Sequence, residues 1–297
     1  MNKKTGLKVL VVGWNENMLR MISRVHESPH EIVLVVLPKS KETFDISVLC
    51  NKLQISHCIT SKVGLVNAVK KLKPDVLVLS RCPWALPKEI WKNTSCINVH
   101  NSLLPKYRGP HPINWALING EVRTGVTVHF TDGSGLDNGP VILQRETPIE
   151  SWDTAKTLRE RLSALGGLLL VEVLDLMKAG GENGVACTEQ DESKASRAPK
   201  RTPEMGKIDW SSLVARQAYN LIRALVHPYP NAFCTNSRTG EKVEFQGAYL
   251  IAEAGNEWGK PGEVLGTKTG GKYLLAAREG TLLVTTDARL VVGDVLE

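Results

Sequence analysis

The sequence carries few of the marks of a redox, metal-binding or membrane protein. Its 297 residues include six cysteines, but no two of them form a CxxC pair and none lies at metal-ligand spacing from a histidine. No apolar run approaches the roughly 20 residues that a helix needs to span a bilayer. The start, MNKKTG, leads directly into a strand pattern, so we expect no secretory leader. These absences predict a protein of the reducing cytoplasm that has no metal site.

The fingerprints of phosphate-binding loops are missing as well. The first apolar run ends in GWNEN at residues 13–17, which lacks the GxGxxG spacing of dinucleotide-binding turns. The chain also contains no GxxxxGK[ST] loop. A bound dinucleotide or a P-loop nucleotide is therefore not predicted.

What the first half does contain is an alternation of short apolar runs and helical patterns. LKVLVVG at 7–13 and EIVLVVL at 31–37 are continuous and Val-rich, which is typical of strands buried on both faces of a parallel sheet. The expected strands are 7–13, 31–37, 57–59 and 75–79, and the expected helices are 15–26, 46–53 and 65–72. This order predicts right-handed βαβ units and a Rossmann-like α/β fold with a parallel sheet.

The second half changes character at a polar stretch. Strands are expected at 125–130 and 141–145, followed by a helix over 154–178 with Asp153 as its N-cap. Residues 187–204 are polar without periodicity, which indicates a linker. Beyond it, we expect a helix capped by Asp209 or Ser211 and short strands that form a small open barrel. The chain is thus divided into a first domain at 1–190, a linker at 191–205 and a small β-rich domain at 206–297.

One stretch places polar groups at the end of an apolar strand. INVHNSLLPKYRG at 97–109 carries Asn98 and His100 two residues apart, so an extended chain directs both to one side. Either residue alone is more often a structural group than a catalyst. A second segment, LDNGP at 136–140, adds the carboxylate of Asp137. Together the two segments predict a site on loops held by a rigid scaffold.

At this point the sequence resembles a family. NVHNSLLPKYRG, NWALINGE, TGVTVHF and LDNGPVILQ, in this order, are similar to the 10-formyltetrahydrofolate-dependent formyltransferases. That family includes methionyl-tRNA formyltransferase, glycinamide ribonucleotide formyltransferase and the amino-sugar N-formyltransferases. RTPEMGKIDW and IRALVHPYPNAF resemble the C-terminal part of the tRNA and sugar members, where the region forms a small open barrel.

The resemblance implies roles for individual residues. Asn98, His100 and Asp137 match the catalytic residues, and 10-formyltetrahydrofolate is the expected formyl donor. The residues expected to bind the donor are Trp84, Leu86, Ser102, Leu103, Leu104, Gly135 and Leu136, and those expected to bind the acceptor are Pro105, Lys106, Tyr107 and Arg108.

Three of these assignments have structural alternatives. Trp84 and Leu86 could wall a flat ring or simply pack as apolar residues. Arg108 could meet a phosphate or the glutamate tail of folate, or could only stitch its loop together. His129, on the expected strand 125–130, could face the site, but we expect it to lie half-buried on the sheet.

Formyl transfer between two amines makes three chemical demands. The acceptor amine must lose a proton, the oxygen of the tetrahedral carbon must be stabilised, and the departing N10 must gain a proton. His100 can exchange a proton near neutral pH, the NH₂ of Asn98 can donate to the oxyanion, and Asp137 can stabilise an imidazolium or accept the amine proton. Which of His100 and Asp137 takes the proton is left open by the sequence.

The acceptor is the least determined part of the prediction. The tRNA-acting members carry a basic insertion of the form PDRPAGRG after the second strand, but PKSKETFD stands here at 38–45, without Gly or Arg. We therefore expect a nucleotide-linked amino sugar or another small amine as acceptor. The alternatives are methionyl-tRNA formyltransferase and a non-catalytic folate- or nucleotide-binding module, and a homodimer is a further expectation. The net charge of +6 fits an anionic substrate but also an ordinary basic surface.

Overall fold

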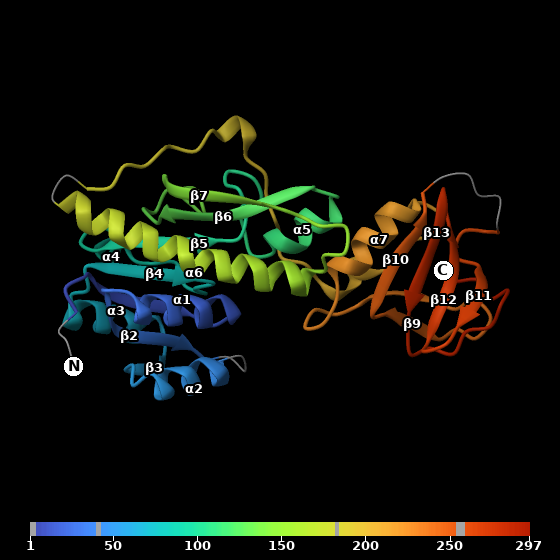
Figure 1. Cartoon of the computed structure of the whole chain (residues 1–297), viewed down its shortest axis with the longest axis horizontal. Helices are drawn as coiled ribbons and strands as arrows, with labels where there is room; N and C mark the ends of the chain where they lie inside the picture. The colour runs from blue at the N-terminus through green and yellow to red at the C-terminus, as the bar shows by residue number, and fades with distance from the viewer. Residues whose placement is uncertain (1–3, 40–42, 182–183, 254–258) are drawn as a thin grey trace. The chain divides into compact units, whose positions relative to one another are not determined.

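The computed structural model describes residues 4–39, 43–181, 184–253 and 259–297 (Figure 1). Its contacts divide the chain into two compact units, each assembled from separate stretches of sequence. Unit 1 comprises Met1–Pro112, Arg123–Pro148 and Glu160–Pro199, and unit 2 comprises Ile113–Val122, Ile149–Arg159 and Lys200–Glu297. The predicted division at 1–190, 191–205 and 206–297, which used only continuous pieces of chain, stays a prediction.

Unit 1 is built on a seven-stranded sheet in the order β3-β2-β1-β4-β5-β6-β7. Its strands are β1 (Lys8–Gly13), β2 (Glu31–Pro38), β3 (His57–Thr60), β4 (Val76–Ser80), β5 (Ser95–His100), β6 (Arg123–Phe130) and β7 (Val141–Pro148). The first five strands of the chain pair in parallel, as their continuous apolar runs predict. The last two pair antiparallel, so the predicted parallel sheet has a mixed edge.

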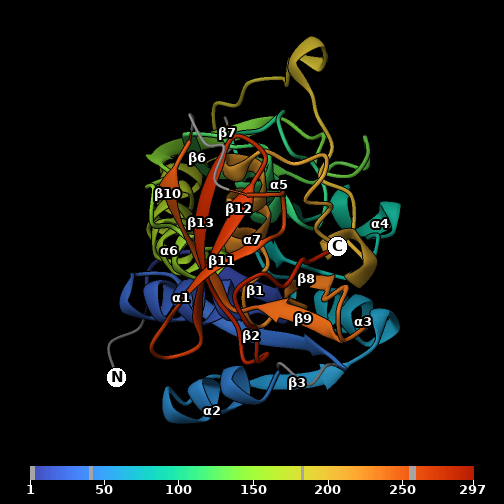
Figure 2. The same ribbon diagram turned by 90° about the vertical axis from the view of Figure 1, so that its right-hand side faces the viewer.

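Helices cover both faces of this sheet (Figures 1 and 2). They are α1 (Glu16–Glu27), α2 (Phe44–Lys52), α3 (Lys62–Leu72), α4 (Lys88–Trp91) and α6 (Ala155–Gly180). On one face, Leu10 and Cys96 pack in a core with Leu65 of α3 and Ile90 of α4. On the other, α6 approaches β5 so closely that a Cβ on Gly166 would lie 3.2 Å from Cγ1 of Val99. The sheet is therefore a rigid, two-sided scaffold for the ends of its strands.

Unit 2 is rich in antiparallel strands, as predicted. Its elements include α5 (Pro112–Ile118, which begins at the last residue of a unit 1 segment), η4 (Pro203–Gly206), α7 (Ala215–Ala224), β8 (Ala232–Thr235), β9 (Lys242–Phe245), β10 (Gly247–Ala252), β11 (Val264–Lys268), β12 (Lys272–Ala277) and β13 (Gly280–Thr285). Four strands form one sheet in the order β10-β13-β12-β11, and β8 pairs with β9. Trp210 and Phe245, both fully buried, meet edge to face in the core.

One predicted helix cap is wrong. The helix expected to start at Asp209 or Ser211 starts at Ala215, and Gln217 there accepts a hydrogen bond from the backbone N–H of Val214. Asp209 instead accepts from the N–H of Ser211 in the preceding turn. At the start of α6, Thr154 and Thr157 each accept from the backbone N–H of the other, and Oγ1 of Thr157 donates to Oδ1 of Asp153 at 3.0 Å. Asp153 as the N-cap of this helix stays a prediction. Ser, Thr and Asp compete for such positions, so the sequence alone does not rank them.

The segment predicted as a linker is fixed along much of its length to unit 1. Thr188 exchanges two backbone hydrogen bonds with Val141, and Arg108 exchanges two with Ser196 and Ala198. It contains one 3-10 turn, η3 (Glu192–Lys194), and continues toward η4. We call residues 187–199 the strap. In the described part of the chain, no helix combines the length and the apolar composition that crossing a membrane requires.

Candidate active site

The paired strands β5 and β6 bring the first polar groups together. Asn98 and His100 lie on alternate positions of β5, and their partners across the antiparallel ladder are His129 and Thr127. Residues two apart on a strand share a face, so these four side chains emerge from one surface of the sheet. Both histidines and Thr127 are buried, and Asn98 is partly buried.

Asp137 joins this group from the loop between β6 and β7. Its Oδ1 accepts a hydrogen bond of 3.1 Å from Nδ2 of Asn98, and its Oδ2 lies 3.6 Å from Nδ1 of His100. The carboxylate also accepts a 2.9 Å bond from the backbone N–H of Gly109. The structure thus brings the three residues expected to be catalytic into one cluster, although they are distant along the chain.

The hydrogen bonds of His100 fix its neutral tautomer. Nε2 lies 2.9 Å from the backbone oxygen of Tyr107, and a carbonyl oxygen can only accept, so Nε2 carries a hydrogen. In the neutral ring the lone pair is then on Nδ1, the nitrogen that faces Asp137. His100 can therefore take up a proton at Nδ1 and hold it against a carboxylate.

His129 is a site residue that sequence reasoning missed. The expectation that it lies half-buried on the sheet is wrong: only 2% of its side chain is exposed, and Nε2 lies 3.1 Å from Nδ2 of Asn98 and 3.7 Å from Oδ1 of Asp137. Its Nδ1 donates to the carbonyl of Phe130 at 2.8 Å, so the neutral ring accepts at Nε2. The alternation of GVTVHF already placed Thr127 and His129 on one face; the antiparallel register with β5, which puts His129 opposite Asn98, was the missing information.

The amide of Asn98 is consequently oriented by two acceptors. One N–H is directed to Asp137 and the other to Nε2 of His129. The opposite orientation would place the amide oxygen against the carboxylate, which is repulsive. The predicted donation from Asn98 to an oxyanion therefore requires one of these two bonds to be exchanged.

The surroundings keep Asp137 ionised. Burial by itself raises the pKa of this carboxyl, but His100, His129 and the N–H of Gly109 outweigh that effect and hold the pKa well below its ordinary range. Its backbone is left-handed, with φ of 57°. A weakly basic carboxylate of this kind stabilises a neighbouring imidazolium better than it accepts a proton.

Arg108 is engaged inside the protein, which favours the second of its two interpretations. It is 2% exposed; Nε and Nη2 donate to Oε1 of Gln190, and Nη1 and Nη2 donate to the carboxylate of Glu192. Tyr107, also buried, donates its backbone N–H to Oγ of Ser196. The turn that contains Tyr107 and Arg108 is thus bound to the strap. No sequence pattern in the strap predicted this contact.

The other predicted binding residues surround this cluster or pack near it. Trp84 and Leu86 are partly buried against the core under α3 and α4. Ser102 donates to the carbonyl of Lys106, and the N–H of Leu104 donates to Thr127, so both shape the turn. The remaining predicted residues are Leu103, Pro105, Lys106, Gly135 and Leu136. Leu136 is 59% exposed on the loop that carries Asp137, and Lys106 is exposed as well. Their roles in binding stay predictions.

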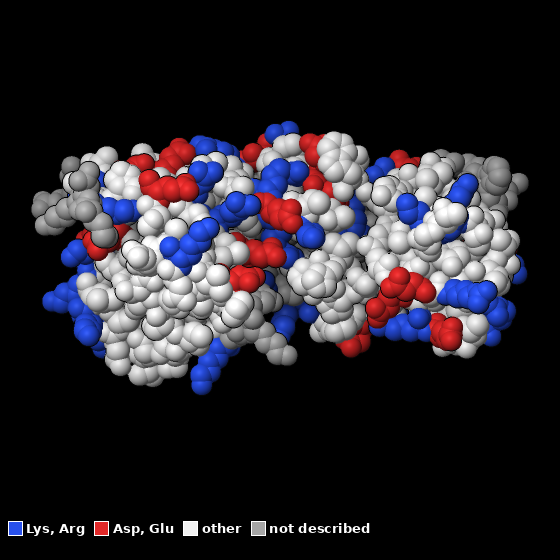
Figure 3. Space-filling view, turned by 60° about the horizontal axis from the view of Figure 1, so that its bottom comes forward, with Lys and Arg blue, Asp and Glu red and all other residues white. Residues whose placement is uncertain are grey.

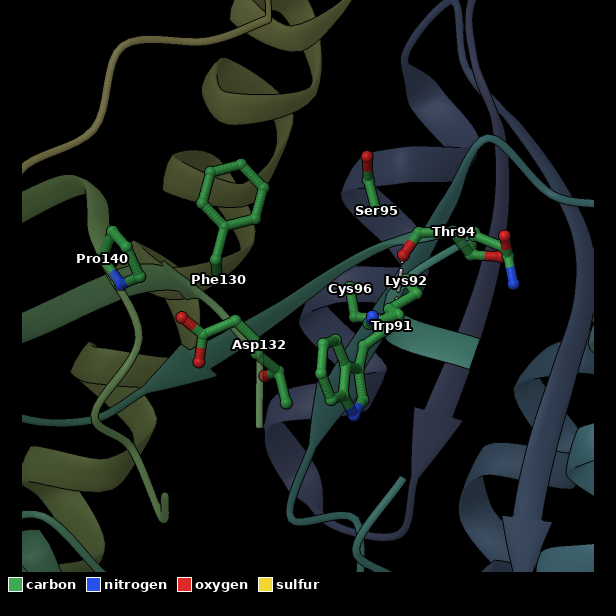
Figure 4. Close-up of a pocket in the computed structure, with 10 residues that line it drawn as sticks. Trp91, Lys92, Thr94, Ser95, Cys96, Phe130, Asp132 and Pro140 are labelled. Carbon is green, nitrogen blue, oxygen red and sulfur yellow. Dashed lines mark hydrogen bonds between the residues drawn. The ribbon is translucent and has the colours of Figure 1, made fainter. Parts of the chain in front are cut away.

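A cavity of about 420 Å³ lies beside the same loop (Figure 4). Phe130, Asp132 and Pro140 line one side, and Trp91 with residues 92–96 lines the other. The ring of Trp91 also packs on the loop backbone, since a Cβ on Gly133 would lie 2.7 Å from it. None of the predicted catalytic residues lines this cavity. In the described residues, no three His, Cys, Asp or Glu side chains are arranged to hold a metal ion.

Comparison with known proteins identifies the family of the chain. A family model described as formyl transferase matches residues 7–174, and one described as formyl transferase, C-terminal domain, matches residues 200–290. A methionyl-tRNA formyltransferase of Caldanaerobacter subterraneus subsp. tengcongensis is 43% identical over 276 residues, which cover 88% of this chain and 86% of that protein.

Solved structures show the same fold at lower identity. An N-formyltransferase from Helicobacter canadensis, in complex with folinic acid and dTDP-3-aminofucose, superimposes with a TM-score of 0.71 at 18% identity and covers 94% of this chain and 99% of its own. HypX from Aquifex aeolicus, in complex with tetrahydrofolic acid, gives 0.70 at 22% identity over 94% of this chain, which spans only 44% of HypX. With one family model matching more than half of its residues and a relative this similar over most of its length, the chain belongs to the formyltransferase family.

Proposed function

We propose that the protein transfers a formyl group from 10-formyltetrahydrofolate to the primary amine of methionyl-tRNA. The observation that carries the choice of acceptor is the 43% identity, over 88% of the chain, to a protein named methionyl-tRNA formyltransferase. Another such protein, from Geotalea uraniireducens, is 32% identical over 96% of the chain. The solved structures are less than 25% identical to this chain, so they support its fold but not the choice of acceptor.

The residues present fit a formyl donor. The carboxylate of Asp137 lies 3.6 Å from the proton acceptor Nδ1 of His100 and 3.1 Å from the amide nitrogen of Asn98, so the groups that serve acyl transfer between amines meet at one carboxylate. When bound, the donor supplies an electrophilic formyl carbon. Leu136, exposed on the loop beside Asp137, and Trp84 are the apolar residues that we expect to contact its ring system.

His100 is the proposed proton acceptor. Nε2 already carries the hydrogen donated to Tyr107, so Nδ1 receives the proton of the attacking amine. Asp137 then stabilises the imidazolium at 3.6 Å, because its own pKa is held too low for it to compete for the proton. The same Nδ1 proton is available for the departing amine. General acid–base help of this kind is worth about 10²–10⁴ in rate.

A nucleotide-linked amino sugar is the second candidate acceptor. This acceptor, which the sequence led us to favour, is not confirmed, because the relatives above 30% identity bear the tRNA name. It keeps one argument: PKSKETFD at 38–45 lacks the Gly and Arg of the basic insertion in tRNA-acting members. Residues 40–42 of that segment lie outside the described residues. On the face in Figure 3, lysines and arginines are interspersed with acidic residues.

A formylation assay separates the candidates. The protein is incubated with 10-formyltetrahydrofolate and, in parallel, methionyl initiator tRNA, the same tRNA without methionine, and dTDP-linked amino sugars, and formylated product is measured by mass spectrometry. We expect formylmethionyl-tRNA only. Formylation of a sugar but not of the tRNA would reverse the choice of acceptor. Folate binding without turnover on any amine would favour the non-catalytic module instead.

A further inference from the structure

The side-chain amide of Gln190, on the strap, makes four hydrogen bonds: Nε2 donates two and Oε1 accepts two. Nε2 donates to the backbone oxygens of Asp137 and Gly139, both at 2.8 Å. Oε1 accepts from Nη2 of Arg108 at 2.8 Å and from Nε at 3.1 Å. Two donors and a twice-used acceptor are what a primary amide provides, and a carboxylate or an apolar side chain of the same size does not.

The groups that Gln190 joins are those that place the catalytic side chains. On one side is the loop whose Asp137 carboxylate faces His100 and Asn98. On the other is Arg108, whose backbone neighbours hold the same site: Tyr107 accepts from Nε2 of His100, and Gly109 donates to Oδ2 of Asp137. Gln190 therefore connects the segment that orients the imidazole to the loop that brings the carboxylate.

The loop needs such a connection because its backbone is unusual. Asp137 has φ of 57°, in the left-handed region that is uncommon outside glycine. Gly139 follows two residues later and passes so close to β6 that a Cβ there would lie 2.0 Å from the oxygen of Phe130. Conformations of this kind persist when surrounding bonds over-determine them, and the two bonds from Gln190 fall on the carbonyls of these two residues.

We propose that Gln190 is a positioning residue of formyl transfer, which clamps the Asp137 loop to Arg108 and so sets the Asp137 carboxylate against His100. The inference rests on the proposed function for its catalytic consequence, but not for the clamp itself. By this proposal the strap takes part in positioning the catalytic groups, although its sequence predicts only a linker.

The strap stays in place without this side chain. Thr188 and Val141 exchange two backbone bonds of 2.8 Å, and the N–H of Arg108 and of Ala198 bond to the oxygens of Ser196 and Arg108 at 2.9 and 2.7 Å. These contacts flank Gln190 on both sides. Substitution of Gln190 should therefore loosen the loop while the fold and the strap are retained.

The test compares Gln190→Glu and Gln190→Leu with Glu189→Gln, a change at the exposed neighbouring position. Gln190→Glu keeps the acceptor for Arg108 but replaces the NH₂ group, and with it both donated hydrogens, by one oxygen that faces the two carbonyls. We expect kcat to fall about 10- to 100-fold in both Gln190 variants, with KM for donor and acceptor within about threefold of wild type and an unchanged Tm. Glu189→Gln should retain wild-type kcat. Hydrogen exchange should become faster in the peptide 131–141, but not in 95–100.

Two outcomes would overturn the clamp. One is unchanged kcat and unchanged exchange in both Gln190 variants; the other is a loss of kcat that tracks a loss of Tm, with faster exchange throughout unit 1. If the wild-type protein formylates no amine, the proposed function fails by itself. The exchange of 131–141 still decides whether Gln190 holds the loop, because that measurement needs no turnover.

Discussion

Nδ1 of His100 faces Oδ2 of Asp137 at 3.6 Å, while Nε2 of the same ring is committed to the carbonyl of Tyr107. Nε2 therefore holds the ring in place, and Nδ1 is the nitrogen that can take up a proton. A proton placed on Nδ1 lies between the end of β5 and the loop of Asp137. On this geometry we propose an order for the roles that the sequence left open: the ionised carboxylate supports the imidazole rather than replacing it.

Removing the charge of Asp137 should slow turnover while leaving binding nearly intact. Asp137→Asn keeps the shape of the side chain but withdraws the negative charge from the imidazolium of His100. We expect kcat to fall by about 10²–10⁴, the usual worth of acid–base help, with little change in the KM of the acceptor. Steady-state kinetics with formylated product as readout checks this. Near-wild-type kcat would remove Asp137 from the mechanism, and His100→Asn should match the defect.

His129 should contribute by fixing the amide of Asn98. His129→Phe removes the acceptor at Nε2 and leaves one N–H of Asn98 without its partner, which costs about 1–3 kcal/mol. We expect kcat to fall about 10- to 100-fold. His129→Gln brings an oxygen close to the position of Nε2 and should restore most of the rate. Equal defects in the Phe and Gln variants would show that the acceptor is not what matters at this position.

The fold and the cluster could be predicted to different depths. Continuous apolar runs such as 7–13 and 31–37 predict buried strands without knowledge of their neighbours, because such a run can be recognised from the local sequence alone. Asn98 and His100 could be placed on one face because residues two apart on a strand point to the same side. His129 could not, because its environment depends on the register between β5 and β6. Gln190 was beyond reach, since nothing in a polar stretch without period tells which loop its side chain will meet.

Gly109 should be among the least replaceable residues of the turn. Its φ is 121°, and a Cβ would lie 2.6 Å from the backbone oxygen of Ala198 on the strap. We expect Gly109→Ala to lower the free energy of unfolding by more than about 2 kcal/mol, and to lower kcat because the N–H bond to Asp137 is displaced. Gly247→Ala, where the added methyl meets nothing within 4 Å and φ is not in the left-handed region, is the matched control. Chemical denaturation of both variants gives the comparison, and equal stabilities would refute the close approach.

A buried histidine remote from the catalytic cluster should make stability depend on pH. His30 is 1% exposed; its Nδ1 accepts from the N–H of Leu7 at 3.0 Å, so Nε2 carries the hydrogen and donates to Asp175 at 3.1 Å. Burial lowers the pKa of His30 below its ordinary value, and Asp175, which is 61% exposed, opposes this only in part. In the folded protein the ring therefore stays neutral at pH values where the unfolded chain already binds a proton.

The sign of the effect follows from that difference. The unfolded histidine titrates near pH 6.5, so between that value and the lower folded pKa the unfolded state holds more protons, and the free energy of unfolding falls as pH is lowered. The stabilisation is complete above about pH 6.5, and its loss cannot exceed about 1.4 kcal/mol per pH unit for one proton. Denaturation of wild type and His30→Gln from pH 8 to pH 5 isolates it: the difference between the two free energies should shrink as pH falls. If the two curves of unfolding free energy against pH run parallel, His30 binds protons equally in the folded and unfolded states. The argument from burial would then be wrong.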